Sequence, residues 1–173
     1  MAAARVEFQR AGYESASTRK IASDAGCNVA LINRYFGSKI GLFETVMEAC
    51  IDLSPLVGLS QDQMVAALVD IALAKAGSQG DFDPVVVAIK SSGSAAAQDV
   101  VRDKLGNPMV EELSSLIGGE DAKQKAGVVL SIISGMFVGR VSIGADALAD
   151  DESEIIQPML TDALKVVLAT GRD

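Results

Sequence analysis

The side chains best suited to molecular recognition lie near the N-terminus, between residues 28 and 39. Asn33, Arg34 and Tyr35 follow one another, and Lys39 comes four residues later. Amide, guanidinium and phenol groups form directional hydrogen bonds, and the two cations attract anions. The segment therefore indicates binding to a polar, negatively charged partner.

Composition restricts catalysis and metal binding. The chain has no histidine and two cysteines, Cys27 and Cys50. Without histidine neither a Ser-His-Asp nor a Cys-His nucleophile can form, and two cysteines alone cannot complete a zinc cluster. We therefore predict no enzyme activity, no metal and no cofactor. Two buried thiols are expected rather than a disulfide, and Cys27 is interpreted as a small buried hydrophobe in preference to a redox switch.

Charge distinguishes the start of the chain from the rest. The 173 residues carry a formal net charge of -8. Residues 1–39 hold six Lys or Arg against three Asp or Glu, a balance of +3, so the remainder carries -11. This asymmetry favours an N-terminal part that meets a polyanion and a larger part that does not. With no apolar run of membrane length and no secretory signal, a cytoplasmic protein without membrane contact is expected.

Helical periodicity runs through nearly the whole chain, and no strand pattern competes with it. Four helices are expected before residue 52, and their starts or ends are marked by Gly12, Thr18, Gly26, Asn28, Gly37 and Ser38. Later helices are expected over residues 60–76, 83–92, 94 onward with an interruption at 106–108, 120–143 and 153–169. The sequence therefore predicts an all-α fold of about nine helices.

The break between the second and third helices is short. Only Ala25-Gly26-Cys27-Asn28 separates them, and glycine adopts turn conformations that other residues find costly. This spacing is typical of a helix-turn-helix, whose second helix enters the DNA major groove, and a plain helical hairpin is the alternative. If the segment is a helix-turn-helix, the Asn33 amide is suited to hydrogen-bond adenine. The Arg34 guanidinium is suited equally to guanine and to a backbone phosphate.

The flanking residues favour the helix-turn-helix. They are Gly12-Tyr13, Ser17-Thr18, Ile21-Ala22, Ala25-Gly26, Arg34-Tyr35-Phe36, Ser38-Lys39 and Leu42-Phe43. Over residues 3–47 this pattern closely resembles the DNA-binding domain of the TetR family of bacterial transcriptional regulators. The resemblance implies an N-terminal three-helix DNA-binding domain over residues 1–46 and a helical ligand-binding and dimerisation domain over residues 47–173.

Transferred position by position, the resemblance implies contacts from the starts of the second and fourth helices to phosphate, and from the third helix to bases. The residues are Thr18, Arg19, Asn28, Val29, Ala30, Asn33, Arg34, Tyr35 and Lys39. The ring of Tyr35 is expected against the core, with its hydroxyl on a phosphate. Asn33 stands where the family usually has tyrosine, so the details of base readout stay open.

The start of the chain also differs from the family. Its members usually carry a longer first helix, preceded by a polar or basic tail. Either this chain is truncated or its native start lies upstream of Met1. A missing basic arm would lower DNA affinity without changing the fold.

Small residues recur every four positions in the helix expected over residues 120–143, at Gly127, Ser131, Gly135 and Gly139. Such a strip lets another helix approach closely. The final helix offers an apolar face formed by Ile156, Leu160, Leu164 and Val167. We predict a two-fold, four-helix interface between two subunits, with tight packing inside one subunit as the alternative.

The resemblance also implies a ligand pocket within residues 60–143. Apolar lining candidates, each of which could instead be simple core, are Phe82, Val86, Ile89, Met109, Leu113 and Phe137. The predicted function is a homodimeric transcriptional regulator, expected to repress from a palindromic double-stranded operator and to be released by a mostly apolar small effector. Effector and operator should then weaken each other's binding by the same factor. A helical interaction module, or a constitutive regulator without ligand response, is the alternative.

Overall fold

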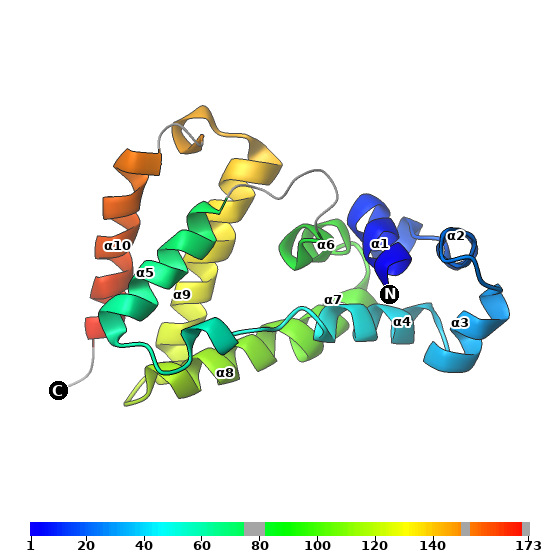
Figure 1. Cartoon of the computed structure of the whole chain (residues 1–173), viewed down its shortest axis with the longest axis horizontal. Helices are drawn as coiled ribbons and strands as arrows, with labels where there is room; N and C mark the ends of the chain where they lie inside the picture. Colours follow the sequence, from blue (N-terminus) through cyan, green and yellow to red (C-terminus); the bar gives the residue numbers. More distant parts are fainter. Residues whose placement is uncertain (75–81, 150–152, 171–173) are drawn as a thin grey trace. The chain divides into compact units, whose positions relative to one another are not determined.

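The computed structural model describes residues 1–74, 82–149 and 153–170, and these residues form helices and no strands (Figure 1). The α-helices are α1 (Ala2–Ser15), α2 (Thr18–Asp24), α3 (Val29–Phe36), α4 (Lys39–Glu48), α5 (Gln61–Leu73), α6 (Pro84–Lys90), α7 (Ala95–Val101), α8 (Asn107–Ile117), α9 (Ala122–Phe137) and α10 (Ser153–Ala169). Shorter 3-10 or π segments are η1 (Ser54–Leu56), η2 (Arg102–Gly106), η3 (Val138–Ile143) and η4 (Asp146–Leu148). Because α7, η2 and α8 run on without a break, the described α-helices form nine separate rods, and the all-α prediction is confirmed.

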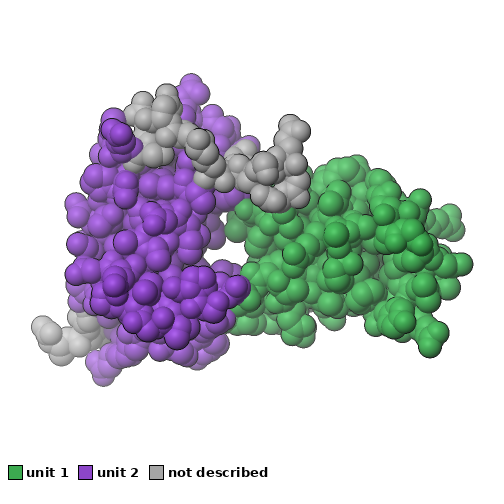
Figure 2. All heavy atoms as spheres, in the orientation of Figure 1, with its two compact units in different colours: residues 1–51, 78–108 green, residues 52–77, 109–173 purple. Residues whose placement is uncertain are grey.

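Two compact units form, shown in separate colours in Figure 2. In the described part of the chain, unit 1 comprises residues 1–51 and 82–108, and unit 2 comprises the rest. Helices α6 and α7 pack on α1 and α4 and so belong to the same unit as the N-terminal helices. The boundary expected after residue 46 divides the chain by expected function, into a DNA-binding part and a ligand-binding part. Unit 1, which is defined by packing, contains the first of these parts together with α6 and α7 from later in the chain.

Side-chain caps begin most of the helices. Asn28, Ser38, Asp83 and Ser94 each accept a backbone N–H from the first turn of the helix that follows, as expected from the sequence. The second helix differs by one residue, because Ser17 is its cap and Thr18 is its first helical residue. Loss of such a cap costs about 1 kcal/mol of stability.

Helix α1 does not end at Gly12, as the sequence predicted, but bends there. Gly12 has φ 67° and ψ 177°, and helical structure resumes to Ser15. The last turn of α6 lies against the bend: the Lys90 ammonium donates to Gln9 O at 2.7 Å, and Tyr13 N–H donates to Ser91 Oγ at 2.9 Å. The bend is therefore joined to α6 through backbone groups on both sides of Gly12.

The core of unit 1 holds the helix-turn-helix in place. The rings of Phe8 and Phe43 meet edge to face at 5.0 Å between centroids, and Tyr13 lies 5.2 Å from Phe43. Ile21 from α2 and Ile32 from α3 are both buried. Helices α2 and α3 are thus anchored through one face each.

Unit 2 is a helical bundle in which α5 packs against both α9 and α10. Its core contains Leu53, Leu56, Met64, Val65, Leu68, Val69, Ala72, Leu113, Ala126, Val129, Ile156, Leu160, Leu164 and Leu168. None of the described helices is long and apolar enough to cross a membrane.

The interruption predicted at residues 106–108 is a change of helix type rather than a break. The π-helical turn η2 connects α7 to α8, and Pro108 lies in the first turn of α8. Proline lacks an N–H and its ring collides with the carbonyl four residues earlier in a regular α-helix. A wider turn immediately before it avoids that collision.

Candidate DNA-binding face

A tight turn joins α2 to α3. Cys27 N–H donates to Ala22 O at 2.9 Å, and Gly26 has φ 64°. No atom lies within 4 Å of the position that a Cβ would take at Gly26, so glycine is favoured there by backbone conformation and not by space. Cys27 is half-buried, and neither cysteine forms a disulfide.

Helix α3 has one anchored face and one open face. Its first N–H groups are capped by Asn28, whose side-chain oxygen accepts from Ala30 N–H at 2.8 Å. Ile32 is buried and Phe36, one turn later, is half-buried. The side chains of Ala30, Asn33, Arg34 and Tyr35 are exposed, and Val29 is half-buried. The structure therefore gathers the polar residues expected to contact bases on the solvent side of one helix.

Tyr35 corrects one expectation. Its side chain is 73% exposed, so its ring does not lie against the core as predicted. The core side of α3 is occupied by Ile32 and Phe36. The Arg34 guanidinium lies 6.0 Å from the centroid of the Tyr35 ring, within the range of a cation–π contact. Arg34 and Tyr35 form an exposed pair on the open face.

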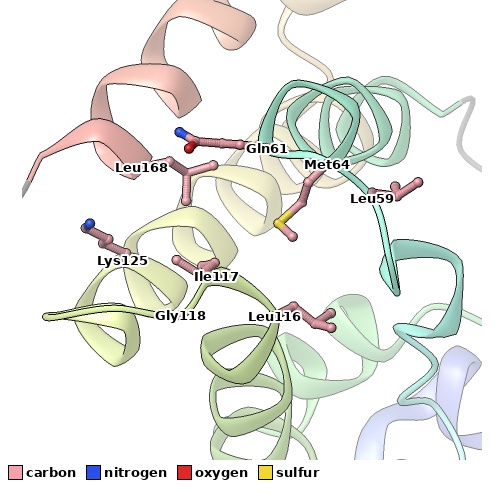
Figure 3. Close-up of a pocket in the computed structure, with 8 residues that line it drawn as sticks. All are labelled: Leu59, Gln61, Met64, Leu116, Ile117, Gly118, Lys125 and Leu168. Atoms are coloured by element: carbon pink, nitrogen blue, oxygen red, sulfur yellow. The ribbon is translucent and has the colours of Figure 1, made fainter.

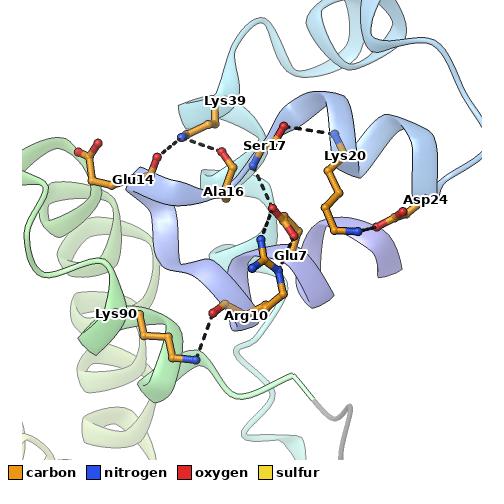
Figure 4. A network of polar contacts seen from close by, with 9 residues as sticks. All are labelled: Glu7, Arg10, Glu14, Ala16, Ser17, Lys20, Asp24, Lys39 and Lys90. Atoms are coloured by element: carbon orange, nitrogen blue, oxygen red, sulfur yellow. Dashed lines mark hydrogen bonds and ion pairs between the residues drawn. The ribbon is translucent and has the colours of Figure 1, made fainter.

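Lys39 is engaged inside unit 1 (Figure 4). Its ammonium donates to Glu14 O at 2.9 Å and to Ala16 O at 3.0 Å, and it lies 4.7 Å from the centroid of the Tyr13 ring. These contacts tie the start of α4 to the end of α1. Because an ammonium has three donors, the phosphate contact predicted for Lys39 would depend on the one that remains.

The start of α2 carries the other expected phosphate contacts. Thr18 is the half-buried first residue of the helix, and Arg19 beside it is exposed. Lys20 is ion-paired with Asp24 at 2.7 Å (Figure 4). Helix α2 packs against α3, so Arg19 belongs to the element that supports the recognition helix.

A buried carboxylate connects α1 to α2, and sequence reasoning missed it. Glu7 is only 1% exposed. Its oxygens accept from Arg10 Nε at 3.0 Å, from the Arg10 guanidinium at 2.9 Å, and from Ser17 N–H at 3.1 Å (Figure 4). The Arg10 hydrogen bonds hold the pKa of Glu7 below its ordinary value, although burial opposes them. The i,i+3 spacing of Glu7 and Arg10 was the available signal, but exposed pairs share it.

Glu7 predicts a loss of stability in acid. Because its pKa is lower in the folded state, its contribution is complete above the unfolded pKa of about 4.3 and disappears as pH falls through the folded value. Glu7→Gln should lose about 1–3 kcal/mol at pH 7. Urea unfolding followed by circular dichroism should show a shallower decline below pH 5 for the variant than for the native chain. Equal declines would contradict this role.

The six residues expected to line a ligand pocket are distributed over both units. Phe82, Val86 and Ile89 belong to unit 1, and the Arg5 guanidinium lies 5.5 Å from the Phe82 ring centroid. Met109, Leu113 and Phe137 belong to unit 2, where Leu113 is fully buried in the core.

The predicted dimer residues of α10 require revision. Ile156, Leu160 and Leu164 are buried in the core of unit 2, and Val167 is half-buried against it. The exposed apolar residues of α10 are instead Ile155, Met159 and Val166, at 60%, 66% and 66% exposure. The helix is apolar on two sides, and its sequence does not tell which side meets the subunit's own core.

The small-residue strip of α9 is open over part of its length. Ser131 and Gly135 are exposed, and Gly127 is half-buried. No atom lies within 4 Å of a Cβ built at Gly127 or Gly135, whereas at Gly139 it would meet the Leu148 side chain at 2.6 Å. Gly139 therefore serves packing within unit 2, and Ser131 and Gly135 face outward.

Comparisons with known proteins agree with this architecture. Residues 1–46 match the model of bacterial regulatory proteins of the tetR family, and residues 62–168 match that of the tetracyclin repressor-like C-terminal domain. The HTH-type transcriptional regulator BetI of Vibrio campbellii (strain ATCC BAA-1116) is 24% identical over 163 residues, covering 86% of this chain and 81% of BetI. A TetR-family regulator of Streptomyces coelicolor A3, known from a crystal structure, has the same fold, with a TM-score of 0.50, 22% identity, and coverage of 97% of this chain and 91% of that one. The chain belongs to the TetR family of bacterial transcriptional regulators.

Proposed function

We propose that this regulator binds a palindromic operator as a homodimer, represses transcription, and is released by a small effector. The observation that supports DNA recognition is the open face of α3. Asn33, Arg34 and Tyr35 are exposed on this face, and the opposite face of the same helix is anchored through the buried Ile32. A rigid helix with polar side chains on its open face fits the major groove. This face also favours DNA recognition over a general helical interaction module.

The exposed groups differ in what they can read. The Arg34 guanidinium can bond guanine through two donors, and the Asn33 amide can do the same with adenine. The Tyr35 ring beside Arg34 restricts the guanidinium, which makes a defined base contact easier to form. Arg19, at the start of α2, is suited to a phosphate, which carries no sequence information.

Arg34→Ala and Arg19→Ala separate these two roles. Arg34→Ala should weaken binding to a selected duplex by about 1–3 kcal/mol and relax the preference at one position in each half-site. Arg19→Ala should weaken all duplexes alike and reduce the slope of log affinity against log salt by about one. Fluorescence anisotropy over a salt series, with a duplex selected from random DNA, measures both effects.

Lys123→Ala is the control, because Lys123 lies on α9 in unit 2 and is ion-paired with Glu111. If Arg34→Ala and Arg19→Ala both bind like this control, the proposed DNA-binding face is wrong. Lys39 is a poor probe of phosphate binding, because its replacement also removes the contacts to Glu14 O and Ala16 O.

The homodimer is supported by exposed apolar and small residues on α9 and α10. The proposed dimer face consists of Val128, Ser131 and Gly135 on α9 and Ile155, Met159 and Val166 on α10. Helices α9 and α10 pack on each other within the subunit. The same pair from a second subunit would complete a four-helix interface and remove these side chains from water.

The effector response is supported by helical continuity between the units. The continuous helical segment formed by α7, η2 and α8 begins in unit 1 and ends in unit 2. Unit 1 is also the unit that contains α3. A ligand that prefers one arrangement of the unit 2 helices would therefore have a direct covalent connection to the unit that carries α3. Its effect on DNA cannot exceed its difference in affinity between the two arrangements. A constitutive regulator, the alternative, would bind DNA equally with and without such a ligand.

A further inference from the structure

The pocket of about 290 Å³ in unit 2 exposes mostly polar surface (Figure 3). Its lining residues are Leu59, Gln61, Met64, Leu116, Ile117, Gly118, Lys125 and Leu168. Met64 and Leu168 are buried in the unit 2 core, so they contribute little to the surface of the pocket. Apolar side chains that are open to a partner lie elsewhere, and one of them is on α3.

Leu31 on α3 is 39% exposed, and it was not among the residues expected to contact DNA. The core side of α3 is filled by Ile32, which is buried, and by Phe36, which is half-buried. Consecutive residues of an α-helix point about 100° apart, because one turn holds about 3.6 residues. Leu31 therefore points to the open side of the helix.

Leu31 is a neighbour of Arg34 and Tyr35 on this open face. Residues three and four positions apart lie next to each other on the surface of a helix. The Arg34 guanidinium lies 6.0 Å from the centroid of the Tyr35 ring. The apolar side chain of Leu31 is thus placed beside the guanidinium that is proposed to contact a base.

The major groove presents one distinct apolar group, the 5-methyl group of thymine, among the hydrogen-bond donors and acceptors of the base edges. The Leu31 side chain has neither a donor nor an acceptor. Against a donor or acceptor of a base it would displace water without replacing the lost hydrogen bond, which is unfavourable. Against a thymine methyl group it would remove apolar surface of both partners from water, which is favourable. An exposed leucine at this place therefore discriminates between bases.

The position of Leu31 along α3 suits contact with a base edge. Recognition helices contact base edges mainly through their N-terminal residues, and Leu31 is the third residue of α3. Leu31 and Arg34 are about 4.5 Å apart along the helix axis, and successive base pairs are about 3.4 Å apart. The two side chains should therefore meet base pairs that are close together in the same half-site.

We propose that Leu31 is a specificity-determining residue that reads the 5-methyl group of a thymine in each half-site, within two base pairs of the base contacted by Arg34. This inference rests on the proposed function, because it names a base of the operator. Ala30 is also exposed, but its single methyl group reaches less far, and Val29 is half-buried. Leu31 is therefore the apolar side chain of α3 best placed for this contact.

Deoxyuridine, which pairs like thymine but lacks its methyl group, tests this inference. It replaces the thymines of a selected palindromic duplex, one position at a time in both half-sites. At the position that Leu31 reads, the affinity of the full native chain should fall by about 4-fold for each half-site, or about 15-fold for the two together, the effect of burying one methyl group in each. Leu31→Ala should bind the thymine duplex more weakly and should bind the thymine and deoxyuridine duplexes alike. Fluorescence anisotropy at low salt, where phosphate contacts strengthen all complexes, keeps the weaker ones measurable.

Two further variants complete this experiment. Leu31→Met keeps an apolar side chain of similar volume and should retain the preference for thymine. Ile71→Ala is the matched control, because Ile71 is 51% exposed on α5 in unit 2 and loses the same number of carbon atoms. It should bind both duplexes like the native chain. Because each variant is compared with itself on two duplexes, a change in its stability does not imitate the expected result.

Two results would overturn the role of Leu31 while the regulator still binds a selected duplex. In the first, the native chain is insensitive to deoxyuridine at every thymine. In the second, Leu31→Ala remains as sensitive as the native chain, which would assign the preference to DNA shape or to another residue. If no duplex is bound more tightly than random DNA, the proposed function itself fails, and this inference fails with it.

Discussion

Gly12→Ala is expected to lower the free energy of unfolding by about 2–6 kcal/mol. Two costs combine at this position. A backbone with φ 67° and ψ 177° is essentially restricted to glycine, and another residue there costs about 1–3 kcal/mol. A Cβ would also lie 2.5 Å from Lys90 O, a backbone atom that cannot move without displacing the end of α6, and such overpacking costs about 1–3 kcal/mol.

Two other glycines separate these costs. Gly26 also has a positive φ, at 64°, but a Cβ there would meet no atom within 4 Å, so Gly26→Ala should show the conformational cost alone. Gly93 has open space and no positive φ, and Gly93→Ala should be close to neutral. Urea unfolding of the three variants gives the order directly. A Gly12→Ala variant no less stable than Gly26→Ala would refute the close contact with α6.

Gly135→Leu is expected to convert the proposed dimer to a folded monomer. Within the subunit a Cβ at Gly135 meets no atom within 4 Å, so unit 2 itself should accept the leucine. At a close contact between subunits the added side chain should cost about 1–3 kcal/mol in each subunit. With both subunits affected, the dimer Kd should rise by between about 30-fold and more than 10⁴-fold. Sedimentation over a concentration series measures this shift, and circular dichroism checks the helix content.

Ala66→Leu is the matched control for this experiment. Ala66 is exposed on α5, which is not part of the proposed dimer face, so the same gain in side-chain size should leave the dimer intact. If Gly135→Leu remains as dimeric as Ala66→Leu, the exposed strip of α9 lies outside the interface.

Much of the helical order could be read from the sequence because it depends on local signals. Ser60, Asp83 and Ser94 cap helices at the predicted starts, and α10 spans the predicted residues. Gly26 marks the turn between α2 and α3 for a reason that involves its own backbone alone. Such features require no knowledge of distant parts of the chain.

Other features depend on contacts between residues far apart in sequence, and these could not be read in advance. Glu7 resembles a surface acid until Ser17 N–H and Arg10 are placed around it. Lys39 looked free for phosphate, but the end of α1 supplies carbonyl acceptors for it. On α10 the choice between two apolar sides depends on where α5 and α9 pack.

The assembly of unit 1 from two separated stretches of chain affects how the protein is made and how it can be recombined. Bonds between α1 and α6 join residues 74 to 81 positions apart. At roughly 5–20 residues per second on the ribosome, about 2–8 seconds separate the synthesis of residue 51 from that of Lys90. During that time α1 is exposed without α6, the helix that packs against it. A chimera that joins residues 1–51 to another regulator's ligand domain would have the same defect permanently, so a transplantable DNA-reading module of this protein must include α6 and α7.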